Sequence, residues 1–461
     1  MAFQPAIEEA IDDIVDRERM ELDVVGQNRD RTDVGSYFVA NYPPFSAWSP
    51  EHVSCAVAAL DEAPKGESPP LGLYIHIPFC RKRCHFCYFR VYTDRNSSDV
   101  DLYLRALAKE AELYSHRAGL RGRQFDFVYF GGGTPSFLSN EQLERLIGRI
   151  REHWQWDHSR EVTFECEPGT LKKSKLEAIR RIGVTRLSLG VEHFDDEVLA
   201  LGNRAHRSAE VFEAYEWARD VGFPQINVDL IAGMLGETDD KWRRTVERTI
   251  GLSPDSVTIY QMEIPHNTTV ARDSKQSGGE VPVAGWGQKR AWVDYAFREF
   301  EAAGYIVSSA YTLIKKDSKH GFVYRDALWH GADLIGTGVA SFSHFAGVHF
   351  QNVDTWEAYM TALLDRGELP LGRALPTTAI QRLTREMILQ LKLGRLDVSY
   401  FERKFGVNVL DRFESVWRAL GQELLARTEE DRVELTRDGL LRVDAILPRF
   451  YEPVYRDVRY T

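Results

Sequence analysis

The amino-acid sequence predicts an α/β protein whose main part is a partial (β/α)6 TIM-type barrel. From residue 71, short runs rich in β-branched and aromatic residues alternate with stretches of amphipathic helical periodicity. Six strand–helix units with right-handed crossovers form a parallel sheet, either open and doubly wound or curled into a partial or complete barrel. The length of the alternating region favours the partial barrel. In each case the active site belongs at the carboxyl ends of the strands.

The strands and helices of this repeat can be placed by their period and their end signals. We expect strands at 73–77, 126–130, 161–166, 186–190, 225–231 and 256–260, and helices at about 98–116, 140–154, 171–182, 208–221 and 239–252. Ser139 and Gln142 have the spacing of a capping box, and Gly183 is suited to end the third helix.

The region after the repeat has a different pattern. We expect a helix at 283–303, a strand at 305–309, a loop-rich stretch at 328–341, helices at 377–393, 398–405 and 410–426, and a β-like run at 432–436. Three helices and a small ribbon predict a winged-helix-like module. Its acidic side chains suit phosphate binding poorly, so we expect a lid or packing domain.

The 461 residues are too many for one ordinary core. We divide them into an N-terminal arm (1–67), the barrel (68–310), a barrel extension with substrate-side loops (311–375) and the C-terminal winged-helix-like lid domain (376–461). No apolar run is long enough to span a membrane, and the first twenty residues are too acidic for a targeting peptide. We therefore expect a cytoplasmic protein.

The net charge of the chain indicates which classes of partner it can bind. The net charge of −11 argues against a nucleic-acid partner, because phosphate binding needs a basic face. A small-molecule substrate is the remaining expectation.

Cys80, Cys84 and Cys87 form a C-x3-C-x2-C run directly after the first predicted strand. Three thiolates leave one metal corner free for a reacting ligand, whereas a structural zinc or a fully ligated cubane takes four protein ligands. The alternative is zinc completed by His76 or His85. Five cysteines are too few for a disulfide framework, and the distant Cys55 and Cys166 read as structural thiols.

Further polar and glycine residues follow the other strands. The triplet Gly131, Gly132 and Gly133, with Thr134 after it, would let backbone N–H groups approach a ligand, although a tight turn explains it equally well. Three carboxylates, Glu165, Glu167 and Asp229, stand near strand ends and need either salt-bridge partners or ligand hydroxyl and ammonium groups. Arg204 could neutralise a ligand carboxylate or be a solvated helix residue.

Taken together, segments 74–87, 130–136, 162–168, 186–194 and 227–236 resemble the radical S-adenosylmethionine (SAM) superfamily, and specifically its oxygen-independent coproporphyrinogen III oxidase-like branch. The resemblance is specific from about residue 74 to 260. It extends loosely through 331–341, Asn352 and the C-terminal module, and segment 35–45 is similar to the N-terminal arm of that family.

The resemblance implies a [4Fe–4S] cluster on Cys80, Cys84 and Cys87, with SAM on the fourth iron as the source of a 5′-deoxyadenosyl radical. By motif position it implies SAM-binding roles for Tyr74, Phe86, Gly132, Gly133, Thr134, Glu165, Arg204 and Asp229. A second SAM would border Gly133, Glu192 and Gly233. The electron would come from a donor such as flavodoxin or ferredoxin.

Three departures from the family pattern concern the substrate. Coproporphyrinogen oxidases carry a further cysteine where this chain has Phe89, glutamine where it has Glu192, and a different turn at 233–238. We therefore expect transfer of a methyl or methylene unit to a small organic substrate. The alternatives are coproporphyrinogen III dehydrogenation, and a haem-binding, chaperone-like protein.

The sequence also suggests residues that could bind haem and residues that could line the substrate pocket. The histidines that could bind haem are His76, His85, His330 and His344. The substrate pocket could be lined by Tyr260, Gln261, Glu263, Trp329, His330 and Asn352, each of which could equally be a packing residue.

Overall fold

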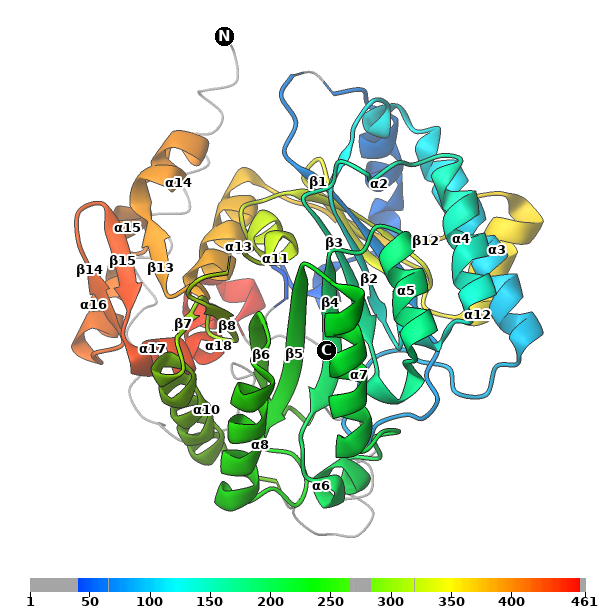
Figure 1. Cartoon of the computed structure of the whole chain (residues 1–461). Helices are drawn as coiled ribbons and strands as arrows, with labels where there is room; N and C mark the ends of the chain where they lie inside the picture. Colours follow the sequence, from blue (N-terminus) through cyan, green and yellow to red (C-terminus); the bar gives the residue numbers. More distant parts are fainter. Residues whose placement is uncertain (1–39, 65, 265–267, 269–282, 319, 457–461) are drawn as a thin grey trace, which may run out of the picture. The chain divides into compact units, whose positions relative to one another are not determined.

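The computed structural model describes residues 40–64, 66–264, 268, 283–318 and 320–456. Their main feature is a twelve-stranded sheet with the order β12-β11-β10-β9-β1-β2-β3-β4-β5-β6-β8-β7 (Figure 1). The six central strands are parallel: β1 (Leu71–Ile77), β2 (Phe125–Gly132), β3 (Glu161–Cys166), β4 (Arg186–Glu192), β5 (Gln225–Ala232) and β6 (Ser256–Gln261). This is the predicted partial barrel.

Helices connect the parallel strands. They are α3 (Ser97–Ser115), α4 (Asn140–Arg151), α5 (Lys173–Arg181), the short α6 (Asp196–Leu201), α7 (Ser208–Val221) and α8 (Asp239–Leu252). Figure 1 shows α4, α5, α7 and α8 lying along the parallel strands. The strands are buried almost throughout, as in β1, because helices cover the outer face of the sheet while side chains fill the inner one.

The predicted strand and helix ends agree closely with the structure. Each of the six predicted strands lies within two residues of the observed bounds. The Ser139 hydroxyl accepts a hydrogen bond from the backbone N–H of Gln142, and the side-chain oxygen of Gln142 accepts one from the backbone N–H of Ser139, so the capping box is confirmed. Gly183 follows α5 with a φ of +95°, a conformation that glycine adopts without strain.

The stretch 328–341, which we expected to be loop-rich, contains a strand. β9 (Asp333–Thr337) pairs in parallel with β1 and extends the sheet through β10 (Phe342–Phe345), β11 (Val348–Asn352) and β12 (Leu371–Pro376). Its glycines suggested turns. A Cβ on Gly336 would lie 2.2 Å from the carbonyl oxygen of Phe342, so this glycine serves a close approach within the sheet.

The other side of the parallel strands is also extended. α10 (Trp286–Ala302) leads into β7 (Tyr305–Val307) and β8 (Thr312–Lys315), which pair antiparallel with each other, and β8 pairs antiparallel with β6. Other helices before residue 377 include α2 (Val53–Asp61), α12 (Trp356–Met360) and a π-helical segment, Thr361–Arg366.

Helix α11 (Val323–Trp329) packs at the amino ends of the parallel strands. Glu161, the first residue of β3, accepts hydrogen bonds from the backbone N–H groups of Val323 and Tyr324. The Tyr324 ring lies 4.4 Å from the ring of Tyr129 on β2. These contacts close the end of the barrel opposite the cysteine loop.

The C-terminal region has a hydrophobic core of its own and is winged-helix-like, as predicted. It comprises α13 (Ala379–Leu391), α14 (Val398–Phe405), α15 (Val409–Arg412), α16 (Glu414–Gln422), α17 (Arg437–Leu441) and α18 (Val443–Ile446), with a sheet of β13 (Arg395–Asp397), β15 (Arg432–Leu435) and β14 (Ala426–Thr428). The helix expected at 410–426 is thus two helices and the start of β14. The lid role and the division at residues 67, 310 and 375 stay predictions.

Two further expectations can be compared with the structure only over the described residues. The structure describes the predicted N-terminal arm only from residue 40, so the first part of segment 35–45 lies outside it. In the part that is described, no helix is both long and apolar enough to cross a membrane.

Candidate active site

The three cysteines lie in the loop that follows β1. The backbone N–H of Cys80 donates to the carbonyl of Tyr92 over 3.1 Å, and the N–H of Cys87 donates to the carbonyl of Cys84 over 3.1 Å. All three side chains line a cavity of about 380 Å³ at the carboxyl ends of the parallel strands. This is the end at which the sequence placed the active site.

The glycine segment after β2 is fastened to the cysteine loop. The N–H of Gly133 donates to Ile77 over 2.8 Å, and the N–H of Thr134 donates to Phe79 over 2.8 Å. The Thr134 hydroxyl lies 3.4 Å from Sγ of Cys80 as a hydrogen-bond donor. A Cβ on Gly133 would be 3.0 Å from this sulfur and 2.9 Å from a backbone oxygen, so the close approach requires glycine.

Arg204, three residues beyond α6, binds the cysteine loop from the opposite side. Its guanidinium donates to Sγ of Cys84 over 3.3 Å and to the carbonyl of Gly190 over 2.6 Å, and lies 3.5 Å from the carboxylate of Glu192. Burial opposes the charge of Arg204, but the negative charges of Cys84 and Glu192 outweigh it and raise its pKa. Arg204 is therefore a fixed cation beside the thiols.

A β-bulge turns Glu192 toward the cavity. The pairing of β4 with β5 shifts register between Gly190 and Glu192, and Glu192 has a φ of +64°, which is rare for a residue with a side chain. Removal from bulk water, with the charges of Asp229 and Glu165 adding to it, raises the pKa of Glu192 to about 7, although Arg204 lowers it.

Glu165 and Asp229 line the same wall from β3 and β5. Glu165 accepts hydrogen bonds from the hydroxyl of Tyr129 (2.7 Å) and the N–H of Gly132 (3.1 Å). Asp229 accepts from Ser188 (2.7 Å) and from a side-chain amide (2.8 Å). Burial raises the pKa of both carboxyls, that of Glu165 to about 7. Neither has an ion-pair partner among the described residues, so the wall suits a cationic ligand.

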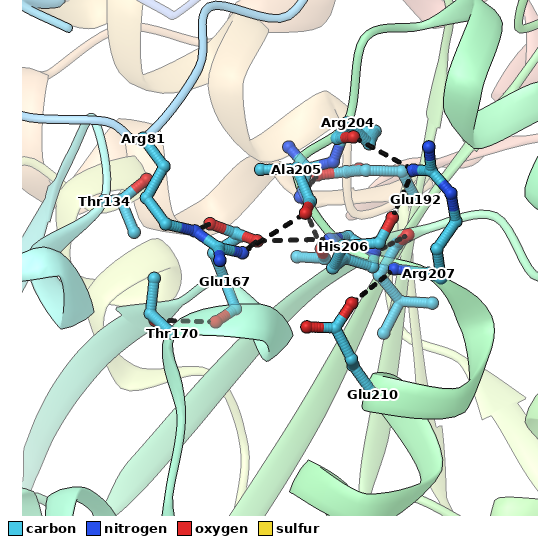
Figure 2. Close-up of polar contacts among 12 residues, drawn as sticks. Arg81, Thr134, Glu167, Thr170, Glu192, Arg204, Ala205, His206, Arg207 and Glu210 are labelled. Atoms are coloured by element: carbon cyan, nitrogen blue, oxygen red, sulfur yellow. Dashed lines mark hydrogen bonds and ion pairs between the residues drawn. The ribbon is translucent and has the colours of Figure 1, made fainter.

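Glu167 forms a salt bridge, which was one of the two interpretations that the sequence allowed for the carboxylates at the strand ends. Arg81 donates to it over 2.6 Å, and His206 lies 3.5 Å away, so both side chains point toward this carboxylate (Figure 2). Burial by itself would raise the pKa of Glu167. Hydrogen bonds from His206 and Arg81 outweigh burial and lower this pKa to about 2. The ion pair of Arg81 with Glu167 connects the cysteine loop to the end of β3.

The remaining predicted cofactor residues are not all in the cavity wall. Phe86 lines it and packs beside Met234 and Met262. Tyr74 lies behind the wall, with its hydroxyl 3.3 Å from Nδ1 of His76. Gly233 also lies behind it, and a Cβ there would be 2.7 Å from the side chain of Lys289.

Of the predicted substrate residues, Tyr260, Gln261 and Glu263 line the cavity, whereas Trp329, His330 and Asn352 do not. Trp329 is buried in the C-terminal core. His330 is exposed and its ring is bonded to the carbonyl of Asp326 (2.6 Å). Asn352 is buried and donates to Glu110 over 2.6 Å. The structure thus places these three residues outside the cavity wall, because α11, the residue that follows it and β11 carry them elsewhere.

The histidines proposed as metal or haem ligands have structural partners. His85 is bonded through its ring to the carbonyl of Leu201 (2.9 Å), and His344 pairs with His349 (2.9 Å). Burial lowers the pKa of His76 to about 4. Among the residues that the structure describes, no three His, Cys, Asp or Glu side chains converge closely enough to bind a single metal ion.

Several cavity residues were missed by the sequence argument. They are Tyr88, Tyr129, Ser188, Ile231 and Met262, and also Cys166, which we had read as a distant thiol. Alternation along β4 and β5 could have identified two of them, because Ser188 and Ile231 stand two residues from Gly190 and Asp229 and share their face. Tyr88 lies in an irregular loop and had no such signal.

Comparisons with known proteins agree with this geometry. A family model of the Radical SAM superfamily matches residues 74–249. An oxygen-independent coproporphyrinogen III oxidase of Salmonella typhimurium is 29% identical over 390 residues, covering 81% of this chain and 84% of that protein. The heme chaperone HemW of Bacillus subtilis is 29% identical over 382 residues, covering 82% of this chain and 98% of the relative.

The solved structures include a similar chain of matching length. Coproporphyrinogen III oxidase (HemN) from Escherichia coli, a radical SAM enzyme, superimposes with a TM-score of 0.79 at 26% identity, covering 90% of this chain and 96% of that one. The match spans the barrel and the C-terminal region together. Residues 74–249 therefore match the radical SAM superfamily, and most of the chain is similar to oxygen-independent coproporphyrinogen III oxidases and to a heme chaperone.

Proposed function

We propose that this protein is a radical SAM enzyme whose cluster is held by Cys80, Cys84 and Cys87. The observation that carries the proposal is the convergence of these three thiols on one cavity with a wall of carboxylates. A cubane on three cysteines keeps one iron open for a cosubstrate. When bound, the cluster and SAM supply one-electron chemistry that yields a 5′-deoxyadenosyl radical, which abstracts a hydrogen atom from the substrate.

Burial disfavours the thiolate state that a cluster needs, and two side chains around the thiols oppose this effect. Burial raises the pKa of Cys80 to about 12, while the hydroxyl of Thr134 opposes that rise. Arg204 places a positive charge 3.3 Å from Sγ of Cys84. A donor and a cation therefore compensate negative sulfur, and metal binding completes the deprotonation.

The charges of the cavity wall suit SAM, which carries a sulfonium and an ammonium group. Five carboxylates line the cavity, Glu165, Glu167, Glu192, Asp229 and Glu263, against three cations, Lys82, Arg83 and Arg204. Arg81 neutralises Glu167. Glu165 and Asp229 have no ion-pair partner among the described residues, which supports binding of a cationic group of the cosubstrate at this wall. A second SAM beside Gly133, Glu192 and Gly233 stays a prediction.

For the substrate we propose a porphyrinogen that the protein oxidises, because the Salmonella relative is named as a coproporphyrinogen III oxidase. Similarity over more than four-fifths of both chains supports this choice. Our expectation of methyl or methylene transfer gains no support from relatives named as oxidases and haem chaperones. A flavodoxin- or ferredoxin-type donor would supply the electron.

The test is anaerobic turnover with coproporphyrinogen III. Protein reconstituted with iron and sulfide is given dithionite and SAM, and 5′-deoxyadenosine and the decarboxylated porphyrin are measured by mass spectrometry. We expect both products from the wild type and neither from Cys84→Ala. Absence of 5′-deoxyadenosine from cluster-loaded wild type would refute a radical SAM enzyme, and S-adenosylhomocysteine in its place would indicate methyl transfer.

A second candidate is haem binding without turnover. It is favoured by the match to 98% of the Bacillus subtilis heme chaperone. Titration of the reconstituted protein with haem, followed by its absorbance, would support this candidate if tight binding accompanied an absence of 5′-deoxyadenosine.

A further inference from the structure

Two aromatic side chains at the cavity are unusually exposed. Phe89 is 50% exposed and Tyr260 is 40% exposed, and both line the cavity that holds the three cysteines. The other large hydrophobic side chains that are exposed in the described part lie outside it: Leu201, Phe212, Ile306, Leu364, Leu424 and Val454. Phe89 comes from the cysteine loop and Tyr260 from β6, so two separate segments bring aromatic surface to one place.

Each exposed ring is supported by a second aromatic ring. The centroids of Phe89 and Tyr88 lie 4.6 Å apart with planes inclined by 32°. The centroids of Tyr260 and Tyr311 lie 6.3 Å apart at 26°, and Tyr311 is buried and bonded to the carboxylate of Asp444. Rings held from behind in this way are pre-positioned, so a ligand meets two prepared surfaces.

Phe89 and Tyr260 reach the cavity from two different segments. Phe89 lies in the loop after the third cysteine and Tyr260 lies in β6, and Tyr88 and Glu263 line the same cavity. The cavity lining therefore combines aromatic surface from two parts of the chain with the carboxylate of Glu263.

The chemistry of these groups selects the ligand. Phe89 has no polar atom and can recognise only an apolar or π-electron surface, which aromatic rings prefer to contact in offset-stacked or edge-to-face geometry. Covering its exposed surface also removes apolar area from water. The Glu263 carboxylate lines the same cavity, and a carboxylate accepts hydrogen bonds from N–H donors. A flat conjugated ring with an N–H group meets all of these conditions.

We propose that Phe89 and Tyr260 form an aromatic clamp for one pyrrole-type ring of the substrate, with Glu263 accepting a hydrogen bond from the ring N–H. This inference rests on the proposed function. The cavity of about 380 Å³ is near the small end of ligand pockets, so a multi-ring substrate enters one ring at a time.

The probe for the clamp is coproporphyrin III, a fluorescent oxidised form of the proposed substrate. It is titrated anaerobically into reconstituted holoprotein, and SAM affinity is measured separately by equilibrium dialysis. We expect Phe89→Ala and Tyr260→Ala each to raise the Kd for coproporphyrin III about 3- to 10-fold. Phe89→Tyr and Tyr260→Phe keep the rings and should stay within about twofold of wild type, with SAM affinity unchanged in all four.

The matched control is Phe212→Ala, which removes a 37%-exposed phenylalanine of α7 outside the cavity and should leave the Kd unchanged. Equal Kd values for wild type, Phe89→Ala and Tyr260→Ala would overturn the clamp and leave the proposed function standing. A parallel loss of SAM affinity in the alanine variants would also overturn it. A wild type that yields 5′-deoxyadenosine but binds no coproporphyrin III would overturn the porphyrinogen assignment and the clamp with it.

Discussion

The guanidinium of Arg204 donates a hydrogen bond to Sγ of Cys84 over 3.3 Å. Because Arg204 also binds the carbonyl of Gly190 at the end of β4, it connects the cysteine loop to the barrel wall. Its charge balances two anionic groups, the Cys84 sulfur and Glu192. Through Arg204, the Cys84 thiol is held in a fixed position relative to β4.

Replacement of Arg204 should therefore affect the cluster before it affects the fold. We expect Arg204→Gln to lower iron content and to reduce 5′-deoxyadenosine formation about tenfold or more, since a charge-assisted hydrogen bond contributes about 1.5–3 kcal/mol. Iron and sulfide analysis with single-turnover assays measures both effects. Arg149→Gln, on the exposed face of α4, is the control. Normal iron content and turnover in Arg204→Gln would contradict this role.

Gly133 should not tolerate a methyl group. In Gly133→Ala the new Cβ would lie 3.0 Å from Sγ of Cys80 and 2.9 Å from backbone atoms that cannot yield easily. We expect loss of most of the bound iron after reconstitution, read from the cluster absorbance. Gly148→Ala is the matched control, because nothing lies within 4 Å of its Cβ and a helical site gains about 0.5–1 kcal/mol of stability from alanine. Equal iron loading of the two variants would contradict the prediction.

The carboxylates of the cavity wall predict a pH dependence. The pKa values of Glu165 and Glu192 are raised to about 7, above the ordinary value of about 4.3. The folded state therefore holds these protons more tightly than the unfolded state, and stability should fall as the pH rises from about 4.5 through 7, by up to about 3 kcal/mol per carboxyl.

The same titration should strengthen cosubstrate binding. SAM is cationic at the groups that would meet this wall, so its affinity should rise as the pH increases from 6 to 8. Chemical denaturation across pH measures the first effect and equilibrium dialysis the second. Glu192→Gln should reduce both slopes. A SAM affinity that is flat with pH in the wild type would contradict the assignment of the carboxylates.

Replacement of Asn352 should change the stability of the folded protein and not its binding of SAM. The Asn352 amide donates to Glu110 (2.6 Å) and to the carbonyl of Gly338 (2.8 Å), and burial raises the pKa of Glu110 to about 8. We expect Asn352→Ala to lower the free energy of unfolding by about 1–3 kcal/mol, because a buried carboxyl loses a donor. SAM affinity of the folded protein should not change. A selective loss of SAM binding with normal stability would return Asn352 to the site.

Local pattern was sufficient for the six parallel strands and the position of the cysteine loop. Apolar runs, helical periods and a capping box depend on residues close in sequence, and the structure has the strands at the predicted places. Because parallel strands share an edge, the convergence of Cys80, Glu165 and Asp229 on one cavity could also be inferred.

Contacts between distant segments decided the rest. The 328–341 stretch contains β9 because Gly336 admits the backbone of Phe342, a constraint that glycine in a sequence cannot distinguish from a turn. Trp329 and Asn352 lie outside the cavity because α11 is capped by Glu161 and β11 is bonded to Glu110. The three cysteines and their strand were determined by the sequence itself, whereas the full set of side chains that line the cavity, including Phe89 and Tyr260, depended on long-range packing that no local period encodes.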